Sequence, residues 1–134
     1  MRRRTLLSSV LFGAAMWAAG KKDTVRGTLV QKPGQKPAVR TPSGKLVTLD
    51  GDEPTRGVLN DPRLAGLDFE AIGKFEGLDT LRIDPIHTRS MFIHRDGKRL
   101  MITYWCAVCA IRTYTPGKCW CCQEETALDP IEHD

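Results

Sequence analysis

All five cysteines of this 134-residue chain lie in one short stretch near its C-terminus. Two Cys-x-x-Cys pairs are separated by nine residues, and the fifth cysteine lies inside the second pair. Each pair can curl so that two thiolates face one point, and a chain reversal between the pairs makes a tetrahedral four-sulfur site. The spacing predicts a metal site formed by Cys106, Cys109, Cys119 and Cys122, with Cys121 as the alternative fourth ligand.

The loop 113–117 provides the reversal, because Pro116-Gly117 is a strong turn signal just ahead of the second pair. Residues 104–124 then resemble the zinc-ribbon and rubredoxin group of four-cysteine knuckles. The resemblance implies a closed structural zinc site, while iron in the same cage would make a one-electron carrier. The segment departs from the usual knuckle in two ways, since neither pair is followed by glycine and the second contains an extra thiol.

Two other uses of the cysteines stay open. Exported proteins often oxidise their cysteines, and two disulfides with one free thiol would account for five. An exposed pair can also exchange disulfides, although thioredoxin-type enzymes place the pair at the start of a helix, whereas here it ends a strand pattern. Covalent haem is excluded, because Ala110 and Gln123 stand where it needs a histidine.

Aromatic residues flank the cysteine pairs. They can shield the sulfurs of an electron carrier, cover a small metal-nucleated core, or dock a protein partner. Outside these aromatics the segment has almost no aliphatic residues besides Val108 and Ile111. We take a partner-binding surface as the working hypothesis for Tyr104, Trp105, Tyr114 and Trp120.

Residues 1–20 predict an export signal peptide. They have a cationic start and then a mostly apolar stretch over 6–19, which is shorter than the roughly 20 residues of a membrane-spanning helix. Small residues at 18–20 suit a signal peptidase. The order Arg3-Arg4-Thr5-Leu6-Leu7 resembles the twin-arginine export signal of bacteria, although an ordinary Arg-rich secretory signal gives a similar pattern. We therefore expect a periplasmic or otherwise exported protein, anchored to the membrane only if this segment stays uncleaved.

The formal net charge of +4 describes that segment more than the protein. Without the three arginines at 2–4, the 20 basic residues become 17, against 16 acidic ones, which leaves a net charge of +1. Neither nucleic acid nor an acidic membrane surface is implied by such a balance.

Residues 21–88 predict a small, mainly β domain, because short alternating runs are broken by Gly and Pro. Strand patterns cover 24–31, 38–41, 45–50, 67–75 and 80–84, with a helical segment around 56–64. This order of elements resembles the OB-fold, a partly open five-stranded barrel. Its two aromatic residues, Phe69 and Phe75, suit a core at least as well as a ligand surface, so we interpret the barrel as a scaffold or protein-binding module.

Residues 89–126 combine a β-hairpin with the cysteine knuckle. Strands over 90–95 and 98–105 flank Asp96-Gly97, which is typical of a type I′ turn. The resulting register pairs Ile93 with Leu100 on the core side and leaves His94 solvated beside Arg99. His87, at a strand end, is interpreted as a loop residue.

The tail 127–134 is polar and predicted to be exposed or frayed. No known catalytic motif occurs anywhere in the chain. The sequence therefore favours a non-catalytic binding or assembly module, with a partner protein in the cell envelope.

Overall fold

The computed structural model describes residues 22–132, so the predicted export signal lies outside the described residues. The described chain is mainly β, with one short α-helix, α2 (Glu53–Leu59), and two 3-10 turns, η3 (Pro62–Leu64) and η4 (His87–Arg89). None of the helices within 22–132 has the length and hydropathy of a membrane-spanning segment. The strands are β1 (Asp23–Val30), β2 (Ala38–Arg40), β3 (Leu46–Asp50), β4 (Asp68–Phe75), β5 (Thr80–Ile83), β6 (Met91–Arg95), β7 (Lys98–Met101), β8 (Tyr104–Cys106), β9 (Ile111–Thr113), β10 (Ala127–Leu128) and β11 (Ile131–Glu132).

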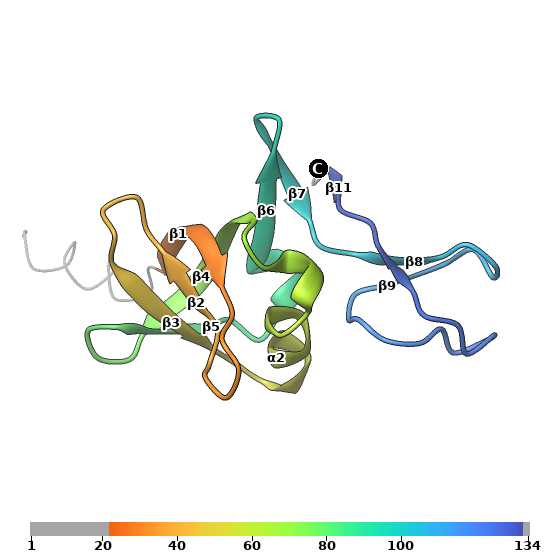
Figure 1. The fold of residues 1–134 in the computed structure, drawn as a ribbon, viewed down its shortest axis with the longest axis horizontal. Helices are drawn as coiled ribbons and strands as arrows, with labels where there is room; N and C mark the ends of the chain where they lie inside the picture. The colour runs from red at the N-terminus through yellow and green to blue at the C-terminus, as the bar shows by residue number, and fades with distance from the viewer. Residues whose placement is uncertain (1–21, 133–134) are drawn as a thin grey trace, which may run out of the picture.

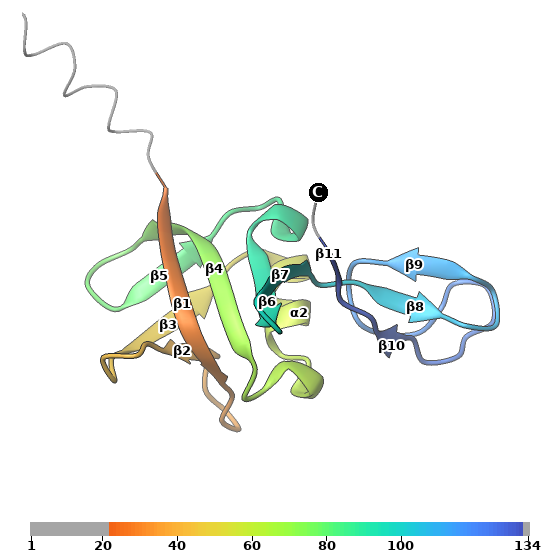
Figure 2. The same cartoon turned by 90° about the horizontal axis from the view of Figure 1, so that it is seen from above.

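Strands β1 to β5 form a small mixed barrel, seen in Figures 1 and 2. The strand order is β1-β2-β3-β5-β4, and pairing of β1 with β4 closes the ring. Only the β3–β5 pair is parallel among these neighbours, and the chain between them passes through α2 and β4. Such a crossover is what a parallel pair requires. The predicted small β-barrel is thus confirmed.

The barrel interior is filled by the alternate residues that the strand patterns predicted. Val25, Leu29 and Phe69 are almost fully buried, whereas Phe75, at the end of β4, is 38% exposed. Two inward positions carry glycine because the neighbouring backbone leaves no room for a side chain. A Cβ atom on Gly27 would lie 2.1 Å from the Arg40 carbonyl oxygen, and one on Gly73 would lie 2.0 Å from that of Arg82.

The α-helix begins earlier than the sequence suggested, at Glu53 rather than near residue 56. Asp52 caps it, since its Oδ1 accepts a hydrogen bond from the Thr55 amide at 3.1 Å, and Pro54 suits the first turn. The helix stops at Leu59, and a second cap, Asp61, starts the separate turn η3. Two successive Asp caps explain why one predicted helix is two short pieces.

The β6–β7 hairpin extends the barrel sheet through pairing of β4 with β6. The predicted register is confirmed, with Ile93 opposite Leu100, and both turn residues have positive φ, as a type I′ turn demands. However, β7 ends at Met101 instead of continuing to residue 105. The buried Ile102 and Thr103 carry the chain into a second sheet, with strand order β10-β8-β9.

Two predictions about exposure are corrected. The tail is not frayed up to residue 132, because β10 pairs with β8 and β11 pairs with β7, so that backbone hydrogen bonds hold its polar residues in both sheets. His94 is not solvated, since its side chain is 14% exposed and its Nε2 lies 2.7 Å from Glu70 Oε1. Pairing of β6 with β4 brings that carboxylate to the hairpin, where it also binds Arg99.

Candidate metal centre

The four cysteines predicted as ligands come together. They lie in and next to the sheet of β8, β9 and β10, which Figure 2 shows at the end of the molecule away from the barrel. Their sulfur atoms all lie within 4.8 Å of one another. Cys106 ends β8 and Cys109 lies in the turn that leads to β9, while Cys119 and Cys122 belong to a turn between Lys118 and Glu125. The first cysteine of each pair is buried and the second is half-buried, so the cluster is partly accessible to solvent.

Both cysteine pairs form the same turn. In each pair the amide of the residue that follows the second cysteine closes the turn. Ala110 donates to the Cys106 carbonyl at 2.8 Å, and Gln123 donates to the Cys119 carbonyl at 3.0 Å. In each turn a backbone N–H also approaches the sulfur of the first cysteine. The Cys109 amide lies 3.4 Å from Cys106 Sγ, and the Cys121 amide lies 3.4 Å from Cys119 Sγ.

These amide donors favour a thiolate, whereas the crowding of thiols opposes several thiolates at once. The backbone N–H groups of Cys122 and Cys121 lower the pKa of Cys119 to about 7. The pKa of Cys109 is raised, chiefly because its thiol hydrogen-bonds to Cys121 and because burial disfavours its charged form. A cluster of this kind loses all its protons only when a cation balances the charge, which is the behaviour of a metal-binding tetrad.

The structure places Cys121 outside the four-sulfur group. Cys121 is exposed, its amide contacts Cys119 Sγ, and its side chain hydrogen-bonds to Cys109 at the edge of the group. All five cysteines are free thiols, and Cys106 Sγ lies 3.5 Å from Cys122 Sγ. Of the two sequence alternatives for the fourth ligand, the arrangement therefore favours Cys122.

The residue that follows each pair adopts the left-handed backbone region. Ala110 has φ 55° and Gln123 has φ 65°. Left-handed φ values favour glycine, so both turns have a backbone that suits glycine although the sequence has alanine and glutamine there.

We predict that Ala110→Gly and Gln123→Gly each stabilise the metal-loaded protein by about 0.5–1 kcal/mol. The left-handed conformation costs a residue with a Cβ about 1–2 kcal/mol, and the greater chain entropy of glycine returns part of that gain. Denaturant unfolding followed by tryptophan fluorescence measures the change. Ala107→Gly is the matched control, because Ala107 lies in the same turn without positive φ and should lose stability. Equal losses at 107 and 110 would contradict the prediction.

The four flanking aromatic residues do not form one exposed surface. Tyr104 is fully buried in the core, which corrects its assignment to a partner surface. Trp105 is half-buried beneath the guanidinium of Arg112, 4.9 Å from its ring centroid. Only Tyr114 and Trp120 are well exposed, at 41% and 88%. Val108, in the first turn, is 73% exposed and was not singled out by the sequence as a surface residue.

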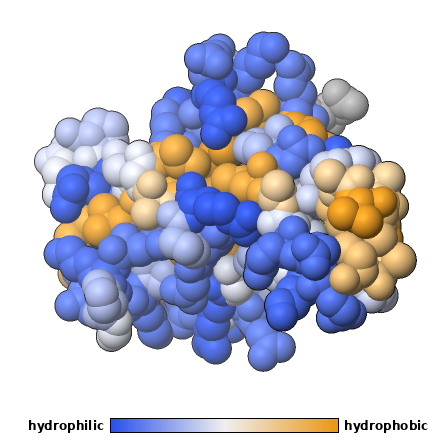
Figure 3. Space-filling model, turned by 45° about the vertical axis from the view of Figure 1, so that its right-hand side comes forward, coloured by the Kyte–Doolittle hydropathy of each residue, from blue (hydrophilic) through white to orange (hydrophobic). Residues whose placement is uncertain are grey.

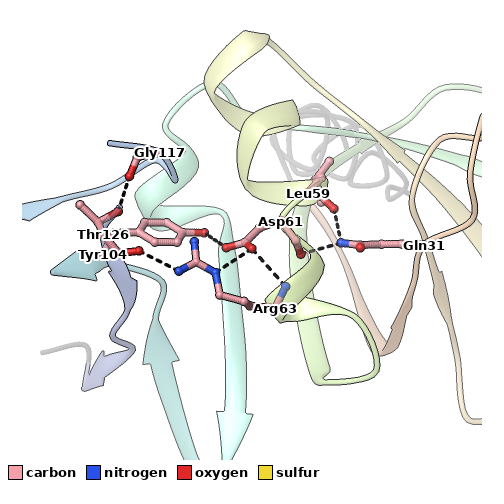
Figure 4. A network of polar contacts seen from close by, with 7 residues as sticks. All are labelled: Gln31, Leu59, Asp61, Arg63, Tyr104, Gly117 and Thr126. Carbon is pink, nitrogen blue, oxygen red and sulfur yellow. Dashed lines mark hydrogen bonds and ion pairs between the residues drawn. The ribbon is translucent and has the colours of Figure 1, made fainter. Parts of the chain in front are cut away.

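A buried polar network joins the cysteine lobe, here residues 104–128, to the barrel (Figure 4). The Tyr104 hydroxyl donates to Asp61 Oδ2 at 2.7 Å, and Arg63 Nε donates to Asp61 Oδ1 at 2.9 Å. Arg63 also reaches the Thr126 carbonyl in the lobe at 2.8 Å. The hydrogen bonds from Arg63 and Tyr104 outweigh burial, which by itself raises the pKa of Asp61, and hold that pKa below its ordinary value.

His87 makes a second hydrogen-bond contact between the barrel and the cysteine lobe. It lies in the turn η4 rather than in a plain loop, and its Nε2 is 2.8 Å from the Tyr114 carbonyl oxygen. A carbonyl only accepts, so Nε2 carries the proton. His87 therefore connects barrel and lobe, and it lies apart from the sulfur cluster.

No protein-family model, no curated protein and no solved structure matches this chain. The function is therefore inferred from the chemistry of the thiol cluster and from the surfaces around it.

Proposed function

We propose that the chain is an exported, non-catalytic binding and assembly module whose knuckle holds a structural zinc ion. The convergence of four sulfurs from two matching turns carries this proposal. Residues 106, 109, 119 and 122 would be the ligands, and four thiolates leave zinc no open position for a substrate.

The composition of the lobe supports a structural role for the metal. Its aliphatic side chains Val108 and Ile111 are 73% and 37% exposed, so they do not form a core around the cysteines. A segment with so little apolar burial needs another source of folding free energy, and a bound metal supplies it.

The barrel is proposed to be an OB-fold that serves as scaffold. The closed strand order with α2 between β3 and β4 supports this class. Its aromatic side chains do not form a stacking platform on the outer face, because Phe69 is buried and Phe75 covers one end of the barrel. We therefore assign partner binding to the lobe rather than to the barrel.

The partner surface is proposed to be the tip of the lobe. Trp120 projects from the second cysteine turn and Val108 from the first, and they are the two most exposed apolar side chains of the lobe. Figure 3 shows apolar surface gathered on this lobe, at the right of the view. Large exposed aromatics anchored on a rigid element are typical of interface hot spots. With the export signal, this favours an accessory subunit of an envelope complex.

Metal analysis with a thiol count on natively exported protein tests the metal assignment. We expect one zinc ion per chain and five thiols that react once chelator and denaturant are present. Iron would replace the proposal by a rubredoxin-like electron carrier. Absence of metal with a single reactive thiol would mean two disulfides, and rapid alkylation of Cys106 or Cys119 in the native protein would indicate a thiol-redox enzyme.

Trp120→Ala is predicted to lower recovery of the partner from envelope extracts about tenfold or more, because truncating an aromatic hot spot costs about 2 kcal/mol or more. Affinity capture on the zinc-loaded chain measures it. Leu78→Ala is the control, since Leu78 is 85% exposed but lies in the barrel. Unchanged recovery of every captured protein by the Trp120 variant would refute the assigned surface.

A further inference from the structure

Three apolar side chains are exposed at the end of the barrel where β3 begins and β4 ends. They are Leu46, Phe75 and Leu78, with exposed fractions of 42%, 38% and 85%. The parallel register of Thr48 with Thr80, continued by two residues, sets Leu46 beside Leu78. Lys45 Nζ donates to the Leu78 carbonyl at 3.3 Å, which keeps the two segments together. We call these three residues the barrel-end edge.

The chain enters the described structure at this same edge. Asp23 pairs with Gly73 in the sheet, and its Oδ2 accepts the Phe75 amide at 3.2 Å. Lys22 forms an ion pair with Asp84, which follows β5. Before Lys22 stand 21 residues, which include the cationic start and the apolar run 6–19. An apolar sequence of that length is therefore attached next to exposed apolar side chains.

Two of the lysines near the edge have carboxylate partners. Lys22 is paired with Asp84 and Lys45 with Asp79, at 3.6 Å for the second pair. Because these two cations already have carboxylate partners, attraction to anionic lipid gains little here, and contact through apolar side chains is favoured over contact through charge.

We propose that the barrel-end edge rests on a lipid bilayer and that the cysteine lobe points away from it. Figures 1 and 2 show the β4–β5 loop and the start of β1 at one end of the molecule, with the lobe at the other. Exposed leucine and phenylalanine side chains suit the interfacial layer of a membrane, where they can enter the acyl region. The inference rests on the proposed export, with the signal segment retained.

Partition of the full chain between buffer and phosphatidylcholine vesicles tests the edge. Leu78→Glu is expected to weaken vesicle binding about tenfold, because the apolar contact of the exposed leucine with the lipid interface is lost. Ile111→Glu is the control, because Ile111 is an exposed apolar residue of the lobe, outside the proposed partner surface and at the far end of the molecule. The control variant should bind like the parent chain, and binding should change little with salt. Equal loss in both variants, or in neither, would overturn the proposal.

Brominated phosphatidylcholine gives a second readout that does not depend on affinity. The fluorescence added by Leu78→Trp should be quenched by about half or more, and that added by Val108→Trp should not, because bromine quenches only tryptophans within the bilayer. Quenching at residue 108 alone would mean that the lobe lies on the membrane. Failure of the chain to bind vesicles at all would also refute the proposal. Zinc content of the same samples is unaffected by these outcomes, so the metal assignment is tested separately.

Discussion

Replacing Cys119 by serine is expected to abolish zinc binding and to unfold the cysteine lobe while the barrel stays folded. Cys119 is 1% exposed, and its sulfur is the acceptor of the Cys121 amide. Structural zinc contributes an apparent 10–16 kcal/mol, roughly, to the folding of small zinc domains, which the exposed aliphatic side chains of this lobe cannot replace. The buried core of the described chain consists almost entirely of residues from Val25 to Ile102, with Tyr104 as its one lobe residue, so we expect the barrel to stay folded without the metal.

Zinc content and amide hydrogen exchange measure the two parts of this prediction. In Cys119→Ser, the metal should fall from one ion per chain to none. The amides of β9 and β10 should exchange freely, and those of β1 and β4 should stay protected. An intact, protected lobe without metal would show that the cysteines are not its source of stability.

Cys121→Ser is the matched control, because it removes a thiol from the same turn but leaves the four grouped sulfurs in place. It should keep one zinc ion per chain, and Cys122→Ser should lose it. The reverse result would assign the fourth ligand to Cys121. Comparing these two neighbours thus separates the alternatives that the sequence alone left open.

The candidate site was predictable because its information is local. Each Cys-x-x-Cys turn closes within five residues, and a proline-glycine turn brings the two together, so spacing alone predicts the four cysteines that meet. The hairpin register was predictable for the same reason, since Asp96-Gly97 determines which residues face one another. Five strands with a helix between the third and fourth were likewise visible as alternating runs.

What the sequence did not predict depends on partners distant along the chain. Tyr104 looked like a surface aromatic of the knuckle, but its hydroxyl bonds to Asp61, 43 residues away. The tail looked frayed because a two-residue strand such as β10 is too short to show an alternating pattern in the sequence. It forms only because β8 is available for pairing. His94 looked solvated, because Glu70 comes from another strand. Such contacts between distant segments cannot be predicted from the local sequence.

The second large effect is expected at Asp61. Its side chain is 2% exposed and takes donors from Arg63 and Tyr104, so Asp61→Ala leaves the buried Tyr104 hydroxyl without its acceptor and removes the ion pair. The Asp61 carboxylate is buried but the Arg63 side chain is 38% exposed, so we expect a loss of about 3 kcal/mol, the lower end of the cost of breaking a buried ion pair. Tyr104→Phe removes a single donor and is expected to cost about 1–3 kcal/mol. Denaturant unfolding of the zinc-loaded protein measures both losses.

Arg26→Ala is the comparison for these variants. Arg26 pairs with Asp68 at 2.9 Å on the surface, where both side chains are about half exposed, so the loss should stay within about 1 kcal/mol. A loss for Asp61→Ala no larger than that would mean that the network of Figure 4 does not hold the lobe to the barrel.

The pH dependence of stability gives Asp61 a further signature. Its pKa is lowered in the folded protein, since the hydrogen bonds from Arg63 and Tyr104 outweigh burial, which raises it. The stabilisation is therefore fully present above the unfolded pKa, about 3.9, and is lost as the pH falls through the folded value. Asp61→Asn should therefore lose less stability than the parent chain as the pH falls. Because thiolate ligands are also protonated in acid, zinc content is measured at each pH and the parent and the variant are compared as metal-loaded chains. The difference between their unfolding free energies should shrink as the pH falls toward about 4. A difference that stays constant over that range would show that Asp61 is not the group responsible.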